Sequence, residues 1–241
     1  MDFDSLLGNL ENTNCVEQLR SCCNIFVDIH NYDYYSLYGS IYTSLLSPSL
    51  HKISGPHNKR PKNNETEHDI LQTCIDSTTP VILGNFSDSK LIFNPLIRTI
   101  HKPNARKLDI YFPIHFPVGK IAIFHLTKRS KKENIEESVF NILPKGRQFA
   151  SEAGLAFVSL IEKEWENIYP ELSQRERHCL LLTADGLSPK NIAEEIGLSQ
   201  HTVIFYLKNV RKKYDAKNIQ SAISKAILKG DIMPQMVSVE T

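Results

Sequence analysis

The sequence lacks the features of an exported or membrane-spanning protein. No run of about eighteen apolar residues, the length that a membrane helix needs, occurs in its 241 residues. Residues 1–10 carry acids instead of the basic stretch and apolar core of a secretory signal. The five cysteines show neither a pairable framework nor a Cys-x-x-Cys spacing. They are Cys15, Cys22, Cys23, Cys74 and Cys179. We therefore expect a protein of the reducing cytoplasm.

Patterns of catalytic chemistry are also missing. The nine histidines form no His-x-x-x-His or His-Glu-x-x-His pattern, and no Gly-x-x-x-x-Gly-Lys phosphate loop occurs. His115 and His125 flank a predicted strand, where surface or hydrogen-bonded core histidines are commoner than metal ligands. The sequence thus predicts no enzyme activity, no catalytic residue, no metal and no cofactor. The net charge of +1 leaves nucleic-acid binding open, because acids elsewhere cancel a local basic surface in the sum.

Hydrophobic periodicity changes along the chain. Up to about residue 128, strand-like stretches such as "DYYSLYGSIYTSLL" and "KIAIFHLT" mix with helical ones such as "HDILQTCI", which indicates an α+β domain. The polar, proline-containing residues 54–69 indicate an exposed loop. Apolar residues at helical intervals then predict a long helix from about Pro144 to Trp165.

A second domain begins after Pro170, which disfavours helix at the residue before it. The predicted boundaries are 1–165 for the first domain, 166–171 for a linker and 172–241 for the second domain. Start and stop signals divide the second domain into four short helices, the third ending near Tyr214 and the fourth running from about Ile219 to Lys229. The predicted caps are Ser173 (in a capping box with Glu176), Ser188 and Ser199 at helix starts, and Gly186, Gly197 and Gly230 at helix ends.

The second and third of these helices form a predicted helix-turn-helix. Only Gly197, Leu198 and Ser199 join them, the tight connection that DNA-reading motifs use. On the third helix, apolar residues at spacings of four, three and four predict a buried stripe of Val203, Leu207, Val210 and Tyr214. The opposite face suits a major groove, because it offers its N-terminal half to base edges and its basic C-terminal half to phosphates. It carries Gln200, His201, Ile204, Phe205, Lys208, Arg211 and Lys212.

The motifs "LSQRER", "ADGLS", "IAEEIGLS" and "TVIFYLKNVRKKY" resemble the DNA-binding domain of LuxR-type transcription regulators. The resemblance implies an all-α domain that binds double-stranded DNA. It places Thr202 and Lys213 at the family's phosphate contacts, and Ile204, Phe205 and Lys208 at its groove-facing positions. Because Ile204 replaces a residue that is often polar or basic in relatives, it favours apolar contact with a base, for instance a thymine methyl group. Lys190 and Ser199 complete the predicted DNA-binding residues.

The stretches "YDYYSLYGSI", "STTPVILGNF", "IFNP" and "LDIYFPIHFPVGKIAIFHLT" occur in an order that resembles the autoinducer-binding domain of quorum-sensing regulators. The resemblance implies an α/β/α sandwich-like sensor and dimerisation domain. The family's polar anchors for an acyl-homoserine lactone fall at Thr66, Ile70, Thr79, Asn94 and His125. Because buried ligand groups without hydrogen-bond partners lose affinity, we expect no response to these lactones.

Two interpretations of the first domain stay open. It holds a different, more apolar small molecule of unknown identity, or its own side chains fill the interior and it serves in dimerisation or protein docking. The predicted pocket residues are Tyr35, Tyr38, Ile70, Thr79, Phe93, Tyr111, Phe124 and His125.

We expect a homodimer that binds a roughly palindromic site, because one recognition helix contacts too few base pairs for adequate discrimination. A competing hypothesis concerns "DIYFP" at Asp109, which imitates the phosphoacceptor strand of receiver domains. Such domains also precede this kind of helix-turn-helix, although Asp109 lies late in the chain for one.

Overall fold

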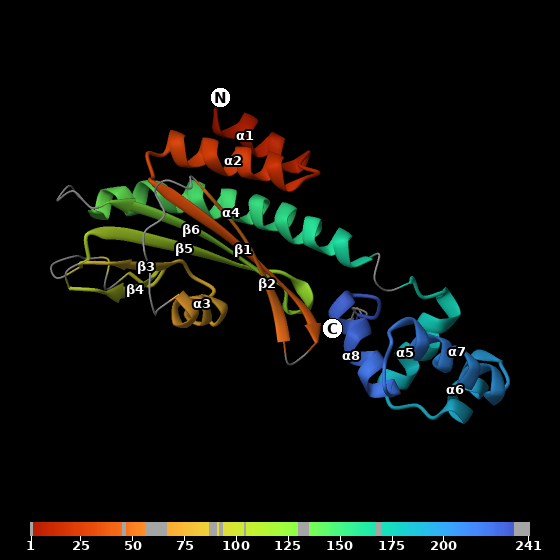
Figure 1. Ribbon diagram of the computed structural model, residues 1–241. Coiled ribbons are helices and arrows are strands. Elements are labelled where there is room, and N and C mark those ends of the chain that lie inside the picture. The colour runs from red at the N-terminus through yellow and green to blue at the C-terminus, as the bar shows by residue number, and fades with distance from the viewer. Residues whose placement is uncertain are drawn as a thin grey trace, which may run out of the picture. The chain divides into compact units, whose positions relative to one another are not determined.

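The computed structural model describes residues 2–44, 47–55, 67–86, 91, 94–103, 105–129, 135–166 and 170–233. Contacts divide the chain into two compact units, one within Met1–Ile41 and Ser49–Glu162, the other containing Lys163–Thr241. The first is built on a sheet, and the second is helical (Figure 1). None of the helices in the described ranges combines the length and the apolar character that a membrane crossing requires.

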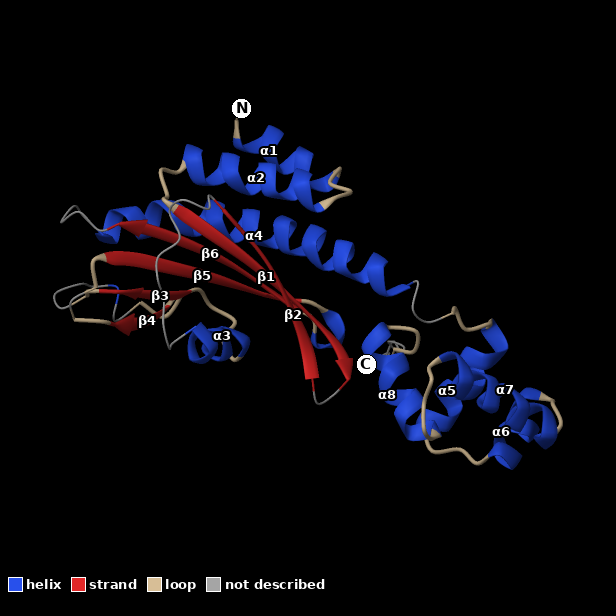
Figure 2. Cartoon of the chain, in the orientation of Figure 1, coloured by secondary structure: helices blue, strands red, loops and turns tan. Residues whose placement is uncertain are grey.

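The N-terminal unit is a six-stranded sheet with helices on both faces (Figure 2). Its elements are α1 (Phe3–Glu11), α2 (Val16–Ile29), β1 (Tyr34–Ser44), β2 (Ser47–Gly55), α3 (Glu67–Ile75), β3 (Val81–Gly84), β4 (Arg98–His101), β5 (Lys107–His115), β6 (Ile121–Arg129) and α4 (Ile135–Glu166). The strand order is β2-β1-β6-β5-β3-β4. Strands β1, β6, β5 and β3 pair antiparallel in that order, and β3 and β4 pair parallel. The predicted α+β class, with a sheet between helices, is confirmed.

Side-chain alternation along the strands builds a separate core on each face of the sheet. On the face covered by α2 and α4, the Phe26 ring stacks on Phe149 with ring centroids 4.1 Å apart and meets Phe124 edge-on at 5.7 Å. Helix α4 lies close to the sheet because Gly146 faces the Phe112 ring, where a Cβ atom would collide. On the opposite face, α3 contributes Ile70, Leu71 and Cys74 to an apolar core that it forms with strand residues. These are Tyr38, Val81, Leu83, Tyr111, Ile121 and Ile123.

Helix α4 begins well before the predicted start. The sequence places proline at the first helical position, whereas Pro144 lies inside a helix that begins at Ile135. Proline removes one backbone hydrogen bond from a helix interior. Val139 and Ile142 are buried in the turns before it, and this packing holds the extra turns in the helix. The predicted end near Trp165 agrees with the observed end at Glu166.

The C-terminal unit consists of α5 (Gln174–Ala184), α6 (Pro189–Ile196), α7 (Gln200–Lys213) and α8 (Ile219–Lys229). The predicted capping box is confirmed, since Ser173 and Glu176 each accept a hydrogen bond from the other's backbone N–H. Helix α6 ends at Gly197, whose φ of 66° is the left-handed conformation that glycine adopts without a steric penalty. The four predicted helices and their caps are therefore correct to within a residue or two.

A polar cluster is buried where β5 pairs with β6. One carboxylate oxygen of Asp109 accepts a hydrogen bond from Thr127 Oγ1 at 2.7 Å and lies 3.1 Å from His125 Nε2. The other oxygen lies 3.1 Å from Lys107 Nζ, and the Tyr111 ring stacks on the imidazole at 4.1 Å between centroids. Burial raises the pKa of Asp109, but the contacts with His125, Lys107 and Thr127 outweigh it and lower the pKa to about 2. The carboxylate is therefore ionised at neutral pH.

The depressed pKa of Asp109 makes stability depend on pH. Ionised Asp109 stabilises the fold above the unfolded-state pKa of 3.8, and this contribution, about 2 kcal/mol, disappears as pH falls through the folded-state value of about 2. We expect Asp109→Asn to destabilise the protein near neutral pH, with the difference from wild type shrinking between about pH 5 and pH 2. Urea unfolding of both proteins across this pH range measures the difference in their free energies of unfolding. The exposed Asp76→Asn serves as control. A destabilisation that stays constant with pH would contradict the prediction.

Candidate functional site

The turn between α6 and α7 sets where α7 starts. After Gly197, the Leu198 N–H donates to the Ala193 carbonyl at 2.9 Å, and the Leu198 side chain packs against the apolar cluster formed by α5, α6 and α7. Ser199 Oγ then accepts from the Thr202 N–H at 3.1 Å, which caps the first turn of α7. A bent, left-handed link and a cap therefore hold the two helices in the angled arrangement of a helix-turn-helix.

One face of α7 forms much of the core of the C-terminal unit. Val203, Val210 and Tyr214 are fully buried and Leu207 is nearly so, which confirms the predicted stripe. Val203 and Leu207 pack with α5 and α6, whereas Val210 and Tyr214 pack with α5 and α8. Contacts with all three neighbouring helices leave α7 no freedom to rotate about its axis, so the face that it exposes is defined.

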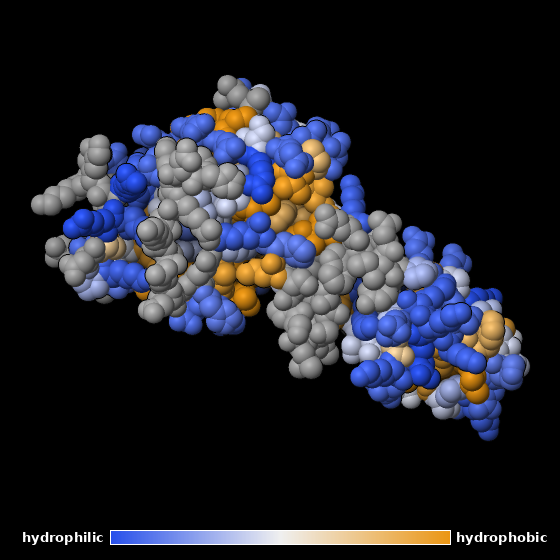
Figure 3. Space-filling model, viewed as in Figure 1, coloured by the Kyte–Doolittle hydropathy of each residue, from blue (hydrophilic) through white to orange (hydrophobic). Residues whose placement is uncertain are grey.

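The opposite face of α7 is exposed along its whole length. The side chains there include two large apolar ones, since Ile204 is 48% and Phe205 is 53% exposed. Lys208 and Lys212 have no ion-pair partner within the part of the chain that the structure describes. Most of the visible surface of this unit is hydrophilic, with a smaller hydrophobic area (Figure 3). The other exposed predicted residues are Lys190 on α6, Ser199 before α7, and Gln200, His201 and Arg211 on α7.

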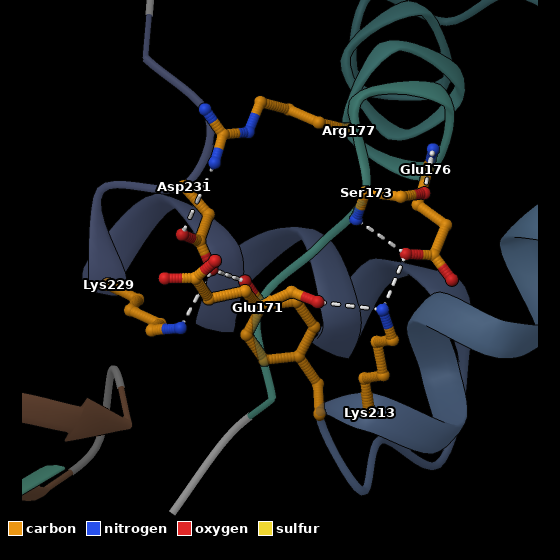
Figure 4. A network of polar contacts seen from close by, with 8 residues as sticks. Glu171, Ser173, Glu176, Arg177, Lys213, Lys229 and Asp231 are labelled. Carbon is orange, nitrogen blue, oxygen red and sulfur yellow. Dashed lines mark hydrogen bonds and ion pairs between the residues drawn. The ribbon is translucent and has the colours of Figure 1, made fainter. Parts of the chain in front are cut away.

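Lys213 differs from the others, because its ammonium group is held within the unit (Figure 4). It lies 2.7 Å from Glu176 Oε2 and donates to the Glu171 carbonyl at 2.7 Å. Burial raises the pKa of Glu176, but the hydrogen bonds from Lys213 and Ser173 lower it below the usual value. Lys213 therefore ties the end of α7 to the start of α5, where the sequence suggested a phosphate contact.

Arg211 and Thr202 are also engaged locally. Arg211 Nη2 donates to the Lys217 carbonyl at 2.7 Å, and the hydroxyls of Thr202 and Ser199 lie 2.7 Å apart. These bonds are at the surface, so neither side chain is withdrawn from solvent. They orient the two ends of the exposed face of α7.

A carboxylate that the sequence analysis missed anchors the end of α7. Asp231, after α8, accepts a hydrogen bond from the Tyr214 hydroxyl and lies 3.3 Å from Lys229 Nζ and 4.0 Å from Arg177 Nη2 (Figure 4). The apolar stripe identified Tyr214 only as a core residue. Its hydroxyl partner lies beyond the next helix, and no local pattern connects the two.

The predicted pocket residues do not all share a side of the sheet. Tyr38, Ile70, Tyr111 and His125 lie on the face that α3 covers. Tyr35 lies on the other face, because strand alternation turns its ring there, and its hydroxyl donates to the Arg20 carbonyl. Phe124 lies on that face too, where it packs against Phe26 of α2 and Phe149 of α4. Phe93 lies outside the described residues.

The positions of the expected lactone anchors show other roles. Thr79 is half-buried before β3, and its carbonyl accepts a hydrogen bond from Ser77 Oγ at 2.8 Å. Ile70 is an apolar residue of the core under α3. Asn94 Oδ1 accepts from the Leu96 N–H at 2.9 Å, a bond within its own loop. Thr66 lies outside the described residues.

The receiver hypothesis does not fit the sheet. Receiver domains have a doubly wound parallel sheet, with functional residues at the carboxyl ends of its strands. Here β5 pairs antiparallel with both neighbours, and Asp109 lies near its start, buried in hydrogen bonds. The resemblance of "DIYFP" to a phosphoacceptor strand is therefore local only.

Comparisons with known proteins agree with this architecture. Residues 170–226 match the family model "Bacterial regulatory proteins, luxR family". The chain is 25% identical over 248 residues to the transcriptional activator protein LuxR of Aliivibrio fischeri, covering 95% of this chain and 94% of that protein. It is 51% identical over 47 residues to the HTH-type quorum-sensing regulator RhlR of Pseudomonas aeruginosa, 20% of each chain.

The fold is similar to that of SdiA from Escherichia coli, with a TM-score of 0.67 at 17% identity over 96% of this chain and 98% of that one. At this identity the likeness concerns the fold alone. Together with the capped α6–α7 turn and the exposed face of α7, the comparisons show that residues 170–226 form a helix-turn-helix domain of the luxR family of bacterial regulatory proteins.

Proposed function

We propose that the protein recognises specific DNA sequences by placing α7 in the major groove. The observation that carries this proposal is the division of α7 into a buried face, packed against α5, α6 and α8, and an exposed face with Lys208 and Lys212. Gln200 and His201, in its first turn, supply hydrogen-bonding groups at the depth of the base edges. Lys208, Lys212 and Lys190 supply positive charge for the phosphates.

The exposed apolar pair suggests what kind of sequence is read. Ile204 and Phe205 lie between the first turn and the lysines, and apolar side chains this exposed are unfavourable in water. The thymine methyl is the apolar group on the base edges of the major groove. We propose that Ile204 contacts a thymine methyl, so that the operator carries A·T pairs at that position of each half-site.

The working form in our proposal is a homodimer on inverted half-sites. One α7 contacts only a few base pairs, and two-fold symmetry would place two such helices in successive major grooves about 34 Å apart. Exposed apolar side chains on two helices, Leu155 on α4 and Ile227 on α8, support contacts between copies. Residues 1–165 would serve as the sensor and dimerisation domain and 172–241 as the DNA-binding domain, joined by the linker 166–171.

We further propose that the sensor domain responds to a small molecule other than an acyl-homoserine lactone. Thr79 and Asn94 already use polar atoms in bonds within their own loops, and Ile70 has no polar atom to offer in its side chain. A lactone would therefore leave polar groups buried without partners. The alternative remains a domain filled by its own side chains.

The first prediction from this function concerns the lysines of α7. Replacing Lys208 and Lys212 together with alanine should weaken operator binding and make its salt dependence shallower by about two charges, because two phosphate contacts are lost. Sedimentation on a duplex with both half-sites measures affinity at several salt concentrations. It also counts the chains bound, and two are expected.

The control for the lysine variant is Arg106→Ala with Arg147→Ala, which removes the same charge from exposed positions of the N-terminal unit. It should keep the wild-type salt slope. Wild-type affinity in the lysine variant would refute the groove assignment, and one chain per duplex at saturation would refute the dimer.

The second prediction tests the thymine contact. Deoxyuridine differs from thymidine only by the methyl group, and burying one methyl is worth about fourfold in affinity. After selection of an operator in vitro, deoxyuridine at the contacted position should weaken wild-type binding by about that factor. Ile204→Ala should bind the two duplexes equally, whereas Lys208→Ala should still distinguish them. If Ile204→Ala stays as sensitive as wild type, another residue makes the contact.

The third prediction concerns the lactones. A ligand that binds only the folded state raises the melting temperature with concentration. A panel of acyl-homoserine lactones of different chain lengths should leave the melting temperature of the full chain unchanged. A saturable upward shift with any of them would show that the sensor domain accepts the family's ligand after all.

A further inference from the structure

Phe205 is an aromatic residue in the middle of the exposed face of α7. It follows His201 by four positions and precedes Lys208 by three, spacings that place the three side chains on one side of a helix. Phe205 is 53% exposed, and its ring contact within the described residues, with Tyr206 at 6.0 Å between centroids, leaves it uncovered. Together with Ile204, which is 48% exposed, it forms an apolar pair on a polar surface, and such pairs mark contact sites.

The charges around Phe205 define the class of its partner. Helix α7 contains no acidic residue, and Lys208 and Lys212 follow Phe205 by about one and two turns. A wholly apolar partner surface would bury these ammonium groups without counter-charges, which is unfavourable. The major groove of DNA satisfies both kinds of side chain, because it offers phosphates beside it and methyl groups on its base edges.

An aromatic ring distinguishes bases in this groove at one position. A phenyl ring contacts the C5 substituent of a pyrimidine, which is a methyl group in thymine and a hydrogen in cytosine. It makes no hydrogen bond to the O4 of thymine or the N4 amino group of cytosine, the groups that otherwise tell the two apart. Methylation of cytosine at C5 puts the same methyl group at the same place. A ring at this position therefore binds 5-methylcytosine as it binds thymine, and prefers both to cytosine.

Phe205 and Ile204 contact different bases in this arrangement. Consecutive residues of a helix point about 100° apart, so the two side chains diverge from the helix axis. A thymine methyl that Ile204 covers therefore leaves the ring of Phe205 to a second base.

We propose that Phe205 makes operator binding sensitive to DNA methylation, because it contacts C5 of a pyrimidine in each half-site and binds 5-methylcytosine there more tightly than cytosine. The proposal rests on the proposed placement of α7 in the major groove, and it adds a modified base to what that surface recognises. Methylation of this cytosine raises the occupancy of the operator at a given concentration of the protein.

The test uses the full chain and the operator selected in vitro. Each pyrimidine of a half-site, on either strand, is presented in two pairs of duplexes that differ by one methyl group: thymine against uracil, and 5-methylcytosine against cytosine. At one position, distinct from that of Ile204, wild type should bind the methylated member of both pairs about fourfold more tightly, the worth of one buried methyl group. Phe205→Ala should bind the members of each pair equally there.

Three further variants separate the ring from other effects. Lys208→Ala should bind more weakly and keep the methyl preference at this position, because it loses charge alone. Ile204→Ala should keep it too, while losing its own preference elsewhere. Phe205→Leu retains an apolar side chain and should retain part of the preference. The melting temperatures of both Phe205 variants should match that of wild type, since the ring is exposed.

A methyl preference that Phe205→Ala retains in full at every position would come from the shape of the methylated duplex, and it overturns the proposal. Equal binding of the paired duplexes by wild type, at every position except that of Ile204, overturns it as well. In both cases wild type still prefers its operator to unrelated DNA, and the proposed function stands. Loss of that preference refutes the proposed function, and the methylation response with it.

Discussion

The burial of one face of α7 is the constraint on which the DNA-binding unit depends. Val203 and Leu207 pack with α5 and α6, and Val210 and Tyr214 pack with α5 and α8, so every other helix of the unit contributes to holding α7. Because a helix with a fixed buried face has a fixed exposed face, the position of the apolar stripe determines which residues point outward. The polar bonds of Lys213 and Asp231 act at its C-terminal end and keep it from shifting along its axis.

Because of these polar bonds, the lysines of α7 have two different roles. Lys213 lies in the same basic run as Lys212, yet its ammonium group binds Glu176 and the Glu171 carbonyl. Its charge is thereby used in joining α5 to α7, whereas that of Lys212 remains at the surface. Neighbouring lysines on one helix point in directions about 100° apart, which explains how adjacent residues come to differ in this way.

The N-terminal unit solves a different packing problem, because its sheet is covered on both faces. On the face toward α2 and α4, the aromatic rings of Phe26, Phe124 and Phe149 pack against one another. The face toward α3 combines apolar side chains with the Asp109–His125–Thr127 cluster. A buried polar cluster is costly unless its groups are paired, and here the carboxylate of Asp109 is paired with Lys107, His125 and Thr127.

The sequence by itself determined the C-terminal unit almost completely. Its helices are short and bounded by local signals, namely serine caps, Pro189 and glycines, and its buried stripe follows a spacing that a single helix dictates. In the N-terminal unit, the mixture of strands and helices could be predicted. Which strand side chains face α3 and which face α2 and α4 could not. Tyr35 and Tyr38 are close in sequence and equally aromatic, yet strand alternation sends them to opposite cores. Only the tertiary structure decided which core contains His125, and only it placed Asp109 and Thr127 beside that residue. The contacts with Asp109 join β5 to β6, and no local pattern in the sequence encodes the register of these two strands.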